Sequence, residues 1–321
     1  MGGGYIARVD GRYDVVVVGK ANVDYLVRGP RLPRPGESVN GELFQQAPGG
    51  KGANQAVGAA RLGARVSLVA RVGNDVRGDS VVEALITEGV EIDHLIRDPS
   101  EPTGVALCQV GGNGEKQILS AAGANARLCA EDVRAAGDAL RSARVVLLQL
   151  GVPLAAVTEA IRIGRSAGAQ VVLDPGPPAP LADDLLAQID VIRPNCSEAL
   201  ALTGVAVVCR DSARAAAAVL LRRGVGAVAV QAGEDGDLLS WSEGEVWLPR
   251  FEVARLDATG AGDAFASAFA VALAEGRPLW EAGPFASAAA ALATTVLGAQ
   301  ASLPRRAAVL ALVESRPERM P

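Results

Sequence analysis

Short runs of apolar, largely β-branched residues alternate along the chain with segments whose apolar residues recur at helical spacing. The apolar runs predict strands that are buried on both faces. These strands are expected at 13–19, 64–73, 143–150, 169–176, 190–195 and 226–233. Helices are expected at 52–63, 78–89, 153–168, 198–204, 212–224, 265–274, 286–299 and 304–316. This alternation predicts a mostly parallel central sheet covered by helices on both faces, a three-layer α/β/α fold.

Two segments depart from this alternation. Residues 22–47 are polar and rich in proline, and residues 103–121 predict a hairpin that turns at Gly111–Gly114. Neither segment has a helical pattern beside it, so both fit poorly in the central sheet. We expect them to form a small β lid over the carboxyl edge of that sheet, with ordinary surface insertion as the alternative. Since no long linker or repeat is present, residues 1–321 are expected to form one domain.

Composition excludes several function classes. Half of the 321 residues are hydrophobic, and the net charge of −5 with a pI near 5.2 argues against nucleic acid as a partner. No apolar run reaches the roughly 18 residues that cross a membrane, and residues 1–14 lack the pattern of a signal peptide. The four cysteines show no CxxC spacing, which argues against disulfides and zinc. We therefore expect a cytoplasmic protein, and we assign no role to His94, the only histidine.

A glycine-rich turn runs directly into an apolar helix at Asp257–Phe265. The first turn of a helix offers unpaired N–H groups and the positive end of the helix dipole, which suits a phosphate. An aspartate there would repel an anion, so Asp263 points to a base that takes a proton from an attacking hydroxyl. Asp is also a favoured helix N-cap, and this segment alone leaves both interpretations open.

Other polar motifs stand at predicted strand ends and helix starts. Asn22 and Asp24, two residues apart, would point the same way and could bind adjacent hydroxyls of a polyol, although both residues are also common in turns. The run Gly49–Asn54 precedes a helix but is neither a P-loop nor a dinucleotide fingerprint. Asn195 and Glu198 could hold a hydrated Mg²⁺ or form a capping box, and both roles are compatible.

Together these motifs resemble those of ribokinase and its relatives, the PfkB-type carbohydrate and nucleoside kinases. The matching segments are GKANVDYLV, GGKGANQAVGAARLGA, EPTGVAL, AAGANARL, RPNCSEALALTG, DATGAGDAF and GAQASLP. They span roughly residues 15 to 304 in the order of the family. GGKGAN together with DATGAGD is highly specific as a pair, and AGAN with GAQASLP indicates the ribokinase branch.

The resemblance implies transfer of the γ-phosphoryl group of ATP to the primary 5-hydroxyl of D-ribose or a closely related sugar. Asp263 would be the base, and the amides of Gly260, Ala261 and Gly262 would form the anion hole. The sugar would be bound by Asp263 and by the lid backbone near Thr103. The remaining sugar contacts implied are Asn22, Asp24, Gly50, Lys51 and Asn54.

The resemblance also implies ATP, Mg²⁺, K⁺ and a homodimer that pairs through the lid. The nucleotide would contact Asn195, Gln231, Gly233, Gly236, Gly262 and Ser287. Asn195 and Glu198 would hold Mg²⁺ through water. The K⁺ positions are Asp257, Thr259, Ala293, Val296, Gly298 and Ser302, several of them acting through backbone carbonyls.

Three positions depart from the family pattern. Gly151 replaces a glutamate that usually contacts the sugar, Ser287 replaces a His or Asn near adenine, and Glu234–Asp235 replaces a more polar or basic pair. The space vacated at Gly151 keeps a nucleoside kinase as the alternative function. A non-catalytic sugar or nucleotide sensor is a remote alternative, since a pure binding protein has no need of Asp263. A Rossmann dehydrogenase lacks its fingerprint after the first strand.

Overall fold

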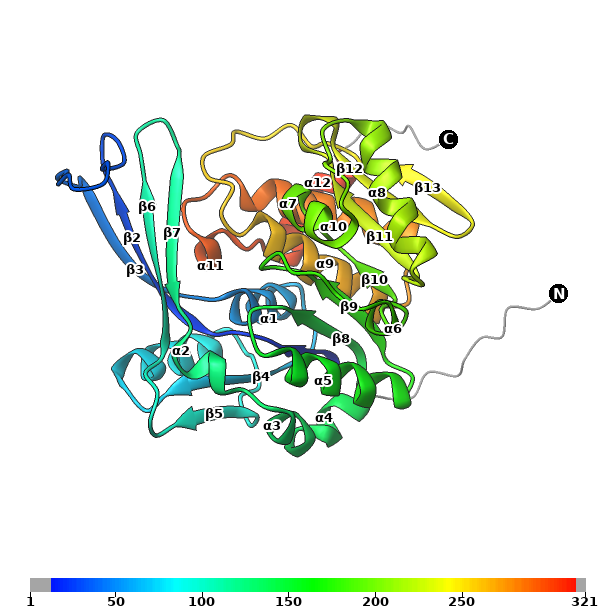
Figure 1. Ribbon diagram of the computed structural model, residues 1–321, viewed down its shortest axis with the longest axis horizontal. Helices are drawn as coiled ribbons and strands as arrows, with labels where there is room; N and C mark the ends of the chain where they lie inside the picture. The colour runs from blue at the N-terminus through cyan, green and yellow to red at the C-terminus, as the bar shows by residue number, and fades with distance from the viewer. Residues whose placement is uncertain (1–12, 316–321) are drawn as a thin grey trace.

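The computed structural model describes residues 13–315 and contains two separate sheets (Figure 1). The central sheet has nine strands in the order β13-β12-β11-β10-β9-β8-β1-β4-β5, and β12 alone runs antiparallel to the other strands. The strands are β1 (Tyr13–Val18), β4 (Val66–Gly73), β5 (Leu95–Asp98), β8 (Ala143–Gln149), β9 (Gln170–Asp174), β10 (Val191–Ile192), β11 (Ala227–Gln231), β12 (Asp237–Trp241) and β13 (Gly244–Trp247).

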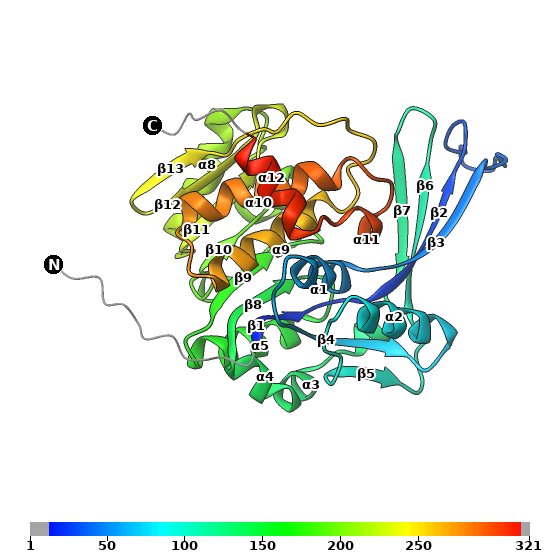
Figure 2. The same ribbon diagram turned by 180° about the vertical axis from the view of Figure 1, so that it is seen from behind.

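Helices cover both faces of the central sheet, as Figures 1 and 2 show from opposite sides. One layer holds α1 (Lys51–Arg61), α9 (Ala261–Ala274), α10 (Leu279–Ala293) and α12 (Arg306–Glu314). The other holds α3 (Ala130–Ala135), α4 (Gly137–Arg141), α5 (Leu154–Ser166), α7 (Cys196–Thr203) and α8 (Arg210–Arg222). The remaining helices are α2 (Val76–Thr87), α6 (Asp183–Leu186), α11 (Ala299–Ser302) and the short 3₁₀ turns η1 (Gly123–Arg127) and η2 (Gly233–Asp235).

The alternation of side chains along β1 creates the two hydrophobic cores. Val15 and Val17 pack into the core beneath α1 and α9, whereas Val16 and Val18 pack into the core beneath α5. A strand that is apolar on both faces needs cover on both faces. The predicted three-layer α/β/α fold is therefore confirmed.

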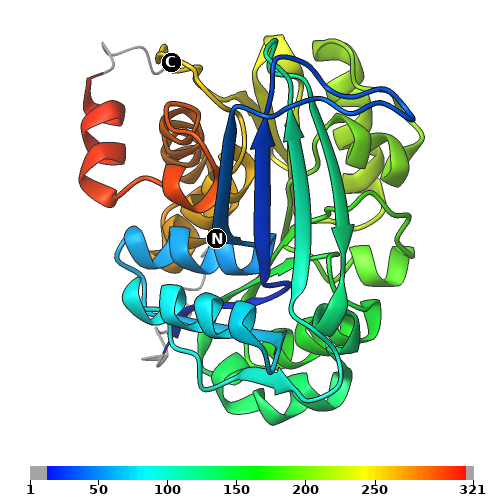
Figure 3. The same ribbon diagram turned by 90° about the vertical axis from the view of Figure 1, so that its left-hand side faces the viewer.

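The small sheet has four strands in the order β3-β2-β6-β7 and lies beside the carboxyl edge of the central sheet (Figure 3). Its strands are β2 (Asn22–Arg28), β3 (Leu43–Gly49), β6 (Gly104–Val110) and β7 (Lys116–Ala121). Both segments that broke the sequence pattern supply these strands. Only residues 19–21 separate β1 from β2, so the chain passes directly from one sheet into the other.

The predicted strands and helices all occur, with boundaries that differ by a few residues at most ends. The predicted strand 190–195 shortens to two residues, because Pro194 has no N–H to donate to a neighbouring strand. The predicted helix 286–299 instead begins at Leu279 and ends at Ala293. The short strand β5 and the antiparallel pair β12–β13 were not predicted.

Some expectations fall partly outside the described residues. The signal-peptide interpretation concerns residues 1–14, of which 1–12 are not described, and Arg316 of the last predicted helix is not described either. Between residues 13 and 315, no helix is long and apolar enough to cross a membrane. The four cysteines are free thiols, and His94 lies in the turn before β5.

Candidate active site

The start of α9 presents a glycine turn and a buried carboxylate at the carboxyl edge of the central sheet. Gly260 is the N-cap with a φ of 85°, a left-handed conformation that glycine adopts without strain. Asp263 is the third helical residue, and only 7 % of its surface is exposed. The amides of this first turn have no carbonyl four residues earlier within the helix. The amide of Ala261 donates to the carbonyl of Ala258 at 3.3 Å, and the amides of Gly262 and Asp263 are available to an anion.

The carboxylate of Asp263 is held by side chains of α1 and not by its own helix. It accepts hydrogen bonds from Asn54 Nδ2 at 2.9 Å and from Gln55 Nε2 at 3.0 Å. It makes no cap bond to a backbone amide of α9, so the N-cap interpretation is wrong. Burial raises the pKa of Asp263, and the nearby carboxylate of Asp174 raises it further. A buried, oriented carboxylate of raised pKa is suited to accept a proton.

Lys51 lies among three carboxylates at the start of α1. Its Nζ donates to both oxygens of Asp174, at 2.9 and 2.7 Å, and lies 4.0 Å from Glu198. Although burial disfavours its charge, the carboxylates of Asp174, Asp263 and Glu198 raise the pKa of Lys51. The sequence analysis missed Asp174, which lies near the end of a predicted strand outside the motifs. It also gave no role to Gln55, although this residue follows Asn54 in the matching segment GGKGANQAVGAARLGA.

Asn22 and Asp24 lie on one face of β2, as their spacing predicts. Asn22 is buried and accepts a hydrogen bond from Asn125 Nδ2 at 2.9 Å. Asp24 packs against the backbone of Gly49, and its Oδ1 is buried without a hydrogen-bond partner. Burial raises the pKa of Asp24 to about 6, the charge of Lys20 opposes this, and that of Asp263 adds to it. An unsatisfied buried carboxylate oxygen is ready to accept from a ligand hydroxyl.

The glycine turn before α1 packs tightly against the connection between β1 and β2. Gly50 has a φ of 88°, and a Cβ there would lie 2.8 Å from the amide nitrogen of Asn22. Thr103 lies at the start of β6, where its hydroxyl donates to Asp75 at 2.7 Å and accepts from the Gly73 amide at 2.9 Å. Thr103 thus anchors the small sheet to the N-terminus of α2, and its side chain is buried.

The space beside Gly151 is not vacant. A Cβ on Gly151 would lie 2.8 Å from Cδ and 3.1 Å from Cγ of Lys20. The prediction of an empty space at this position is therefore wrong, because the stem of Lys20 fills it. The reason for favouring a bulkier nucleoside substrate is removed with it.

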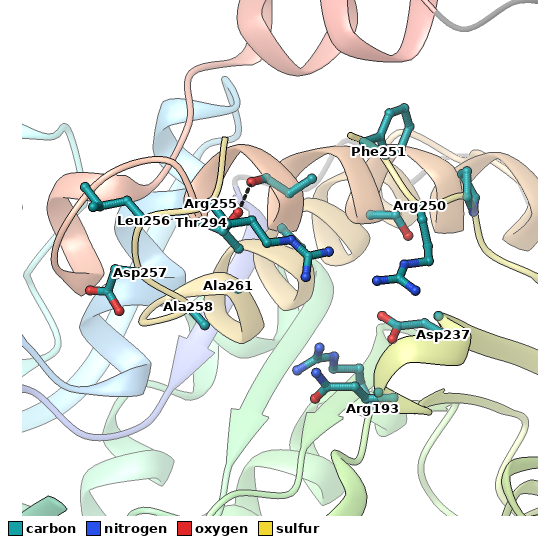
Figure 4. Close-up of a pocket in the computed structure, with 17 residues that line it drawn as sticks. Arg193, Asp237, Arg250, Phe251, Arg255, Leu256, Asp257, Ala258, Ala261 and Thr294 are labelled. Atoms are coloured by element: carbon teal, nitrogen blue, oxygen red, sulfur yellow. Dashed lines mark hydrogen bonds between the residues drawn. The ribbon is translucent and has the colours of Figure 1, made fainter. Parts of the chain in front are cut away.

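A cavity of about 320 Å³ lies beside the turn at residues 257–261, and Asp257, Ala258 and Ala261 line it (Figure 4). Four of the predicted nucleotide contacts line it, namely Gln231, Gly233, Gly236 and Ser287. Asn195 and Gly262 are not among its lining residues. Arg193, Arg250 and Arg255 also line it and give it positive charge, beside the carboxylate of Asp237. The hydroxyl oxygen of Ser287 is buried without a hydrogen-bond partner.

Arg193 was missed by the sequence analysis. It is only 8 % exposed, and its guanidinium lies 4.9 Å from the ring centroid of Phe265. A Cβ on Gly262 would lie 2.8 Å from Arg193 Nη1, so the cation abuts the first turn of α9. Its Nε is buried and has no hydrogen-bond partner. The sequence did offer one indication of its role. Arg193 stands two residues before Asn195, so a cation was to be expected at the same strand end.

Asn195 and Glu198 form the expected capping box at the start of α7. Asn195 Oδ1 accepts from the Glu198 amide at 2.9 Å, and Glu198 Oε2 accepts from the Asn195 amide at 2.9 Å. Burial and the charge of Asp174 raise the pKa of Glu198, while Lys51 opposes this. Within the described part of the chain, no group of three or more His, Cys, Asp or Glu side chains forms a metal cluster.

Asp257 forms the centre of the predicted K⁺ group. Its carboxylate accepts from the amides of Thr259 and Gly298, each at 3.0 Å, and Ser302 Oγ donates to the Thr259 carbonyl at 3.3 Å. The structure therefore brings Asp257, Thr259, Gly298 and Ser302 together. The Asp257 amide bonds to the carbonyl of Thr294, next to Ala293, whereas Val296 is 42 % exposed and no hydrogen bond joins it to Asp257.

A side-chain cation already reaches this group from the small sheet. The ammonium of Lys116, in β7, donates to the carboxylate of Asp257 and to the hydroxyl of Thr259. Although burial opposes ionisation, the hydrogen bonds that the carboxylate accepts from Lys116, Gly298 and Thr259 hold the pKa of Asp257 at about 2. The carboxylate is therefore charged at neutral pH, and β7 is linked to the turn that precedes Asp263.

The chain was compared with known proteins. The model of the pfkB family carbohydrate kinases matches residues 12–306. A ribokinase of Haemophilus influenzae is 39 % identical over 303 residues, which cover 94 % of this chain and 99 % of that protein. A deoxyribokinase of Salmonella typhi is 35 % identical over 292 residues, which cover 91 % of this chain and 95 % of that protein.

Solved structures agree with these sequence relatives. The structure of Arabidopsis thaliana ribokinase complexed with ribose and ATP superimposes with a TM-score of 0.86 at 35 % identity, covering 95 % of this chain and 99 % of that one. The agreement extends over both sheets, since almost the whole chain is aligned. The chain therefore belongs to the pfkB family of carbohydrate kinases, and it is an ATP-dependent sugar kinase of the ribokinase type.

Proposed function

We propose that this enzyme transfers the γ-phosphoryl group of ATP to the primary 5-hydroxyl of D-ribose. One observation carries the proposal: the first turn of α9 holds both the buried carboxylate of Asp263, which accepts from Asn54 and Gln55, and Ala261, which lines the arginine-rich cavity of about 320 Å³. A phosphate donor in that cavity and a sugar hydroxyl at Asp263 would meet at the start of α9.

In this mechanism Asp263 takes the proton of the sugar hydroxyl as the hydroxyl attacks the phosphoryl group. Asn54 and Gln55 hold the carboxylate in position. The amides of Gly260, Ala261 and Gly262 stabilise the charge on the transferring group, and the guanidinium of Arg193 lies against Gly262 to assist them. Asn22, Asp24, Gly50, Lys51 and the backbone near Thr103 orient the sugar.

ATP would occupy the arginine-rich cavity. Gln231, Gly233, Gly236 and the orphan hydroxyl of Ser287 would face the nucleoside, and Asn195 with Gly262 would face the phosphates. Arg193 and Arg255 supply charge that suits a triphosphate. This assignment explains why a cavity lined by three arginines opens at the N-terminus of a helix.

Mg²⁺ fits beside Asn195 and Glu198. Glu198 is a buried carboxylate whose pKa is raised first by burial and then by Asp174, so a nearby cation would favour its ionised form. One amide and one carboxylate would suffice for Mg²⁺, because this ion usually binds through one or two carboxylates and keeps several of its waters. When bound, Mg²⁺ neutralises charge on the nucleotide phosphates.

A monovalent cation such as K⁺ fits the group around Asp257 less completely. Asp257, Thr259, Gly298 and Ser302 lie together and the carboxylate is ionised, but Lys116 already donates to it. The backbone carbonyls of Ala293 and Val296 would complete the site. K⁺ and Lys116 would therefore compete for one carboxylate, and we expect K⁺ to activate the enzyme only modestly.

We also propose that the small sheet acts as a lid and pairs two subunits. Its register puts Asp24, Cys108 and Lys116 on the face toward the active site. The opposite face carries Tyr25, Val27, Phe44, Leu107 and Leu119. Phe44 is 63 % and Leu119 is 73 % exposed, an apolar surface that a second copy would cover. The free thiols fit a cytoplasmic location.

An ADP-release assay with ATP and Mg²⁺ over ribose, 2-deoxyribose, other pentoses, fructose and nucleosides tests the substrate. We expect ribose to give the highest kcat/KM. Turnover of nucleosides without turnover of ribose would contradict the proposal. A second candidate substrate is 2-deoxyribose, since one relative is a deoxyribokinase, and the same assay ranks the two sugars.

A further inference from the structure

Lys20 lies across Gly151 at the carboxyl edge of the central sheet. A Cβ on Gly151 would meet three carbons of the Lys20 stem, at 2.8, 3.1 and 3.3 Å. The two residues come together because β1 and β8 are parallel neighbours whose last paired residues are Val18 and Leu148. Any side chain at residue 151 would therefore occupy the volume that Lys20 now fills.

The backbone of Lys20 contacts residues beside the predicted sugar site. Its carbonyl accepts from the Ala53 amide at 3.1 Å and lies 2.8 Å from where a Cβ of Gly50 would be. Its charge acts on the buried carboxylate of Asp24. The backbone of Lys20 therefore contacts the glycine turn before α1, while its side-chain stem lies against Gly151.

The ammonium of Lys20 has hydrogen-bonding capacity to spare. The side chain is half-buried, and among residues 13–315 it makes no hydrogen bond and no ion pair within 4 Å. An ammonium has three donors and no acceptor. A half-buried donor beside an unsatisfied carboxylate oxygen of Asp24 makes a matched donor and acceptor for a polyhydroxyl ligand.

We propose that Lys20 is a specificity-determining residue: its ammonium donates a hydrogen bond to an oxygen of the bound sugar from the space that a residue-151 side chain would fill. The proposal rests on the proposed function as a sugar kinase. The glutamate that usually stands at position 151 in the family would accept a hydrogen bond from the sugar. The ammonium of Lys20 instead donates one, so it requires an acceptor oxygen on the sugar. The substrate class is therefore a sugar that carries a hydroxyl or carbonyl oxygen at this point.

The contact between Lys20 and the sugar is tested by measuring kcat/KM of wild type and of Lys20→Met on D-ribose and on sugars that each lack one oxygen. The sugars are D-ribose, 2-deoxy-D-ribose, 3-deoxy-D-ribose and 1,4-anhydro-D-ribitol, each of the last three lacking one oxygen. Removing a charged hydrogen bond corresponds to a loss of roughly 10- to 100-fold in kcat/KM. We expect the wild-type enzyme to discriminate by about this factor against one of the three, and Lys20→Met to lose the discrimination against that sugar alone.

A double-mutant cycle tests whether Lys20 and a side chain at position 151 occupy the same volume. We expect Gly151→Ala to raise the KM for ribose in the wild-type background, because its methyl group displaces Lys20. In the Lys20→Ala background the same change should have little effect, so the two effects are not additive. Lys20→Gln keeps a donor and should retain part of the discrimination. Arg305→Met, which removes a charge from a 75 % exposed side chain before α12, is the control and should match wild type.

The outcomes separate this proposal from the proposed function. An enzyme that is active on ribose but shows the same discrimination in wild type and Lys20→Met overturns the role of Lys20 alone. A fall in kcat with unchanged discrimination also overturns it, since Lys20 would then act on phosphoryl transfer. A wild-type enzyme inactive on every sugar overturns the proposed function and this proposal with it. Thermal melting of each variant identifies any that fails to fold.

Discussion

In the central sheet, Val15–Val18 of β1 have no exposed surface, whereas all six residues of β7 in the small sheet are exposed. β1 carries a run of four valines, whereas β7 has only Ile118 and Leu119 as large apolar residues, and both are exposed. The central sheet is covered by helices on both faces, and the small sheet has one face toward the active site and one open face. We infer that side chains of the first sheet stabilise the fold, while those of the second serve ligands and partners.

The largest effect should follow a change at the edge where the two sheets meet. Asp263→Asn keeps the shape of the side chain but removes the carboxylate that we propose as the base. We expect kcat to fall by about 10²- to 10⁴-fold, the usual range for a general base. Steady-state ADP release measures this, with thermal melting as a control for folding. Near-normal turnover by Asp263→Asn would show that another group takes the proton.

A matched pair of leucines tests the difference in stabilisation directly. Leu147→Ala, in β8, removes a side chain with no exposed surface and should lower the free energy of unfolding by about 2–5 kcal/mol. Leu119→Ala, in β7, should change it by less than about 0.5 kcal/mol in the monomer. Denaturant titration measures both. Equal losses would mean that the small sheet is as firmly packed as the central one.

Leu119 also tests the pairing of subunits. Sedimentation of Leu119→Lys should show more monomer than wild type, because a charge is introduced into the apolar face.

The pH dependence of sugar binding should report Asp24. Because its pKa in the folded protein is about 6, the carboxylate loses its charge as pH falls through 6, and kcat/KM for the sugar should fall up to about tenfold per pH unit below that. Asp24→Asn should remove this part of the profile. The sign for stability is opposite: since folding raises this pKa from 3.8, the contribution of Asp24 to stability decreases as pH rises from 3.8 through about 6. A flat wild-type profile between pH 5 and 7 would contradict the assignment.

The smallest effect should come from the contact between β7 and the turn before α9. Lys116→Met removes the cation that lies on Asp257. We expect a few-fold lower kcat in Na⁺ or choline buffers and a larger activation by K⁺ than in wild type, since K⁺ would no longer compete with Lys116. Equal activation of both enzymes would show that Lys116 does not share the cation position. Arg34→Met, on an exposed loop of the small-sheet segment, controls for loss of charge.

The fold could be predicted wherever the local pattern of apolar residues matches the side of the element that is buried in the core. The Val run of β1 and the periodic helix α5 were found because each needs only its own residues to reveal its environment. The helix α10 was misplaced at both ends, since its start at Leu279 lies among residues with no strong apolar period and Pro284 sits within it. The antiparallel pair β12–β13 was missed because its short strands carry no continuous apolar run.

The residues of the candidate site likewise fall into those that a local motif reveals and those that only the tertiary fold brings together. The motifs around Asp263, Asn54 and Asn195 stand in recognisable runs, so their residues could be named beforehand. Gln55 and Asp174 were missed because their role depends on a contact across 119 positions. Lys116 reaches Asp257 over 141 positions, and Lys20 meets Gly151 across neighbouring strands. No local pattern signals a contact that only the tertiary fold creates.

The packing of Lys20 on Gly151 bears on how such enzymes diverge. Positions 20 and 151 are 131 residues apart but share one volume, so their identities are coupled, and neither can be interpreted alone. A single change to glutamate at 151 would place a carboxylate against the lysine stem, and a single loss of the lysine would leave a void. Substrate preference here would evolve most readily through paired replacements at positions 20 and 151. A substrate assigned to this chain from the residue at position 151 alone would therefore be wrong.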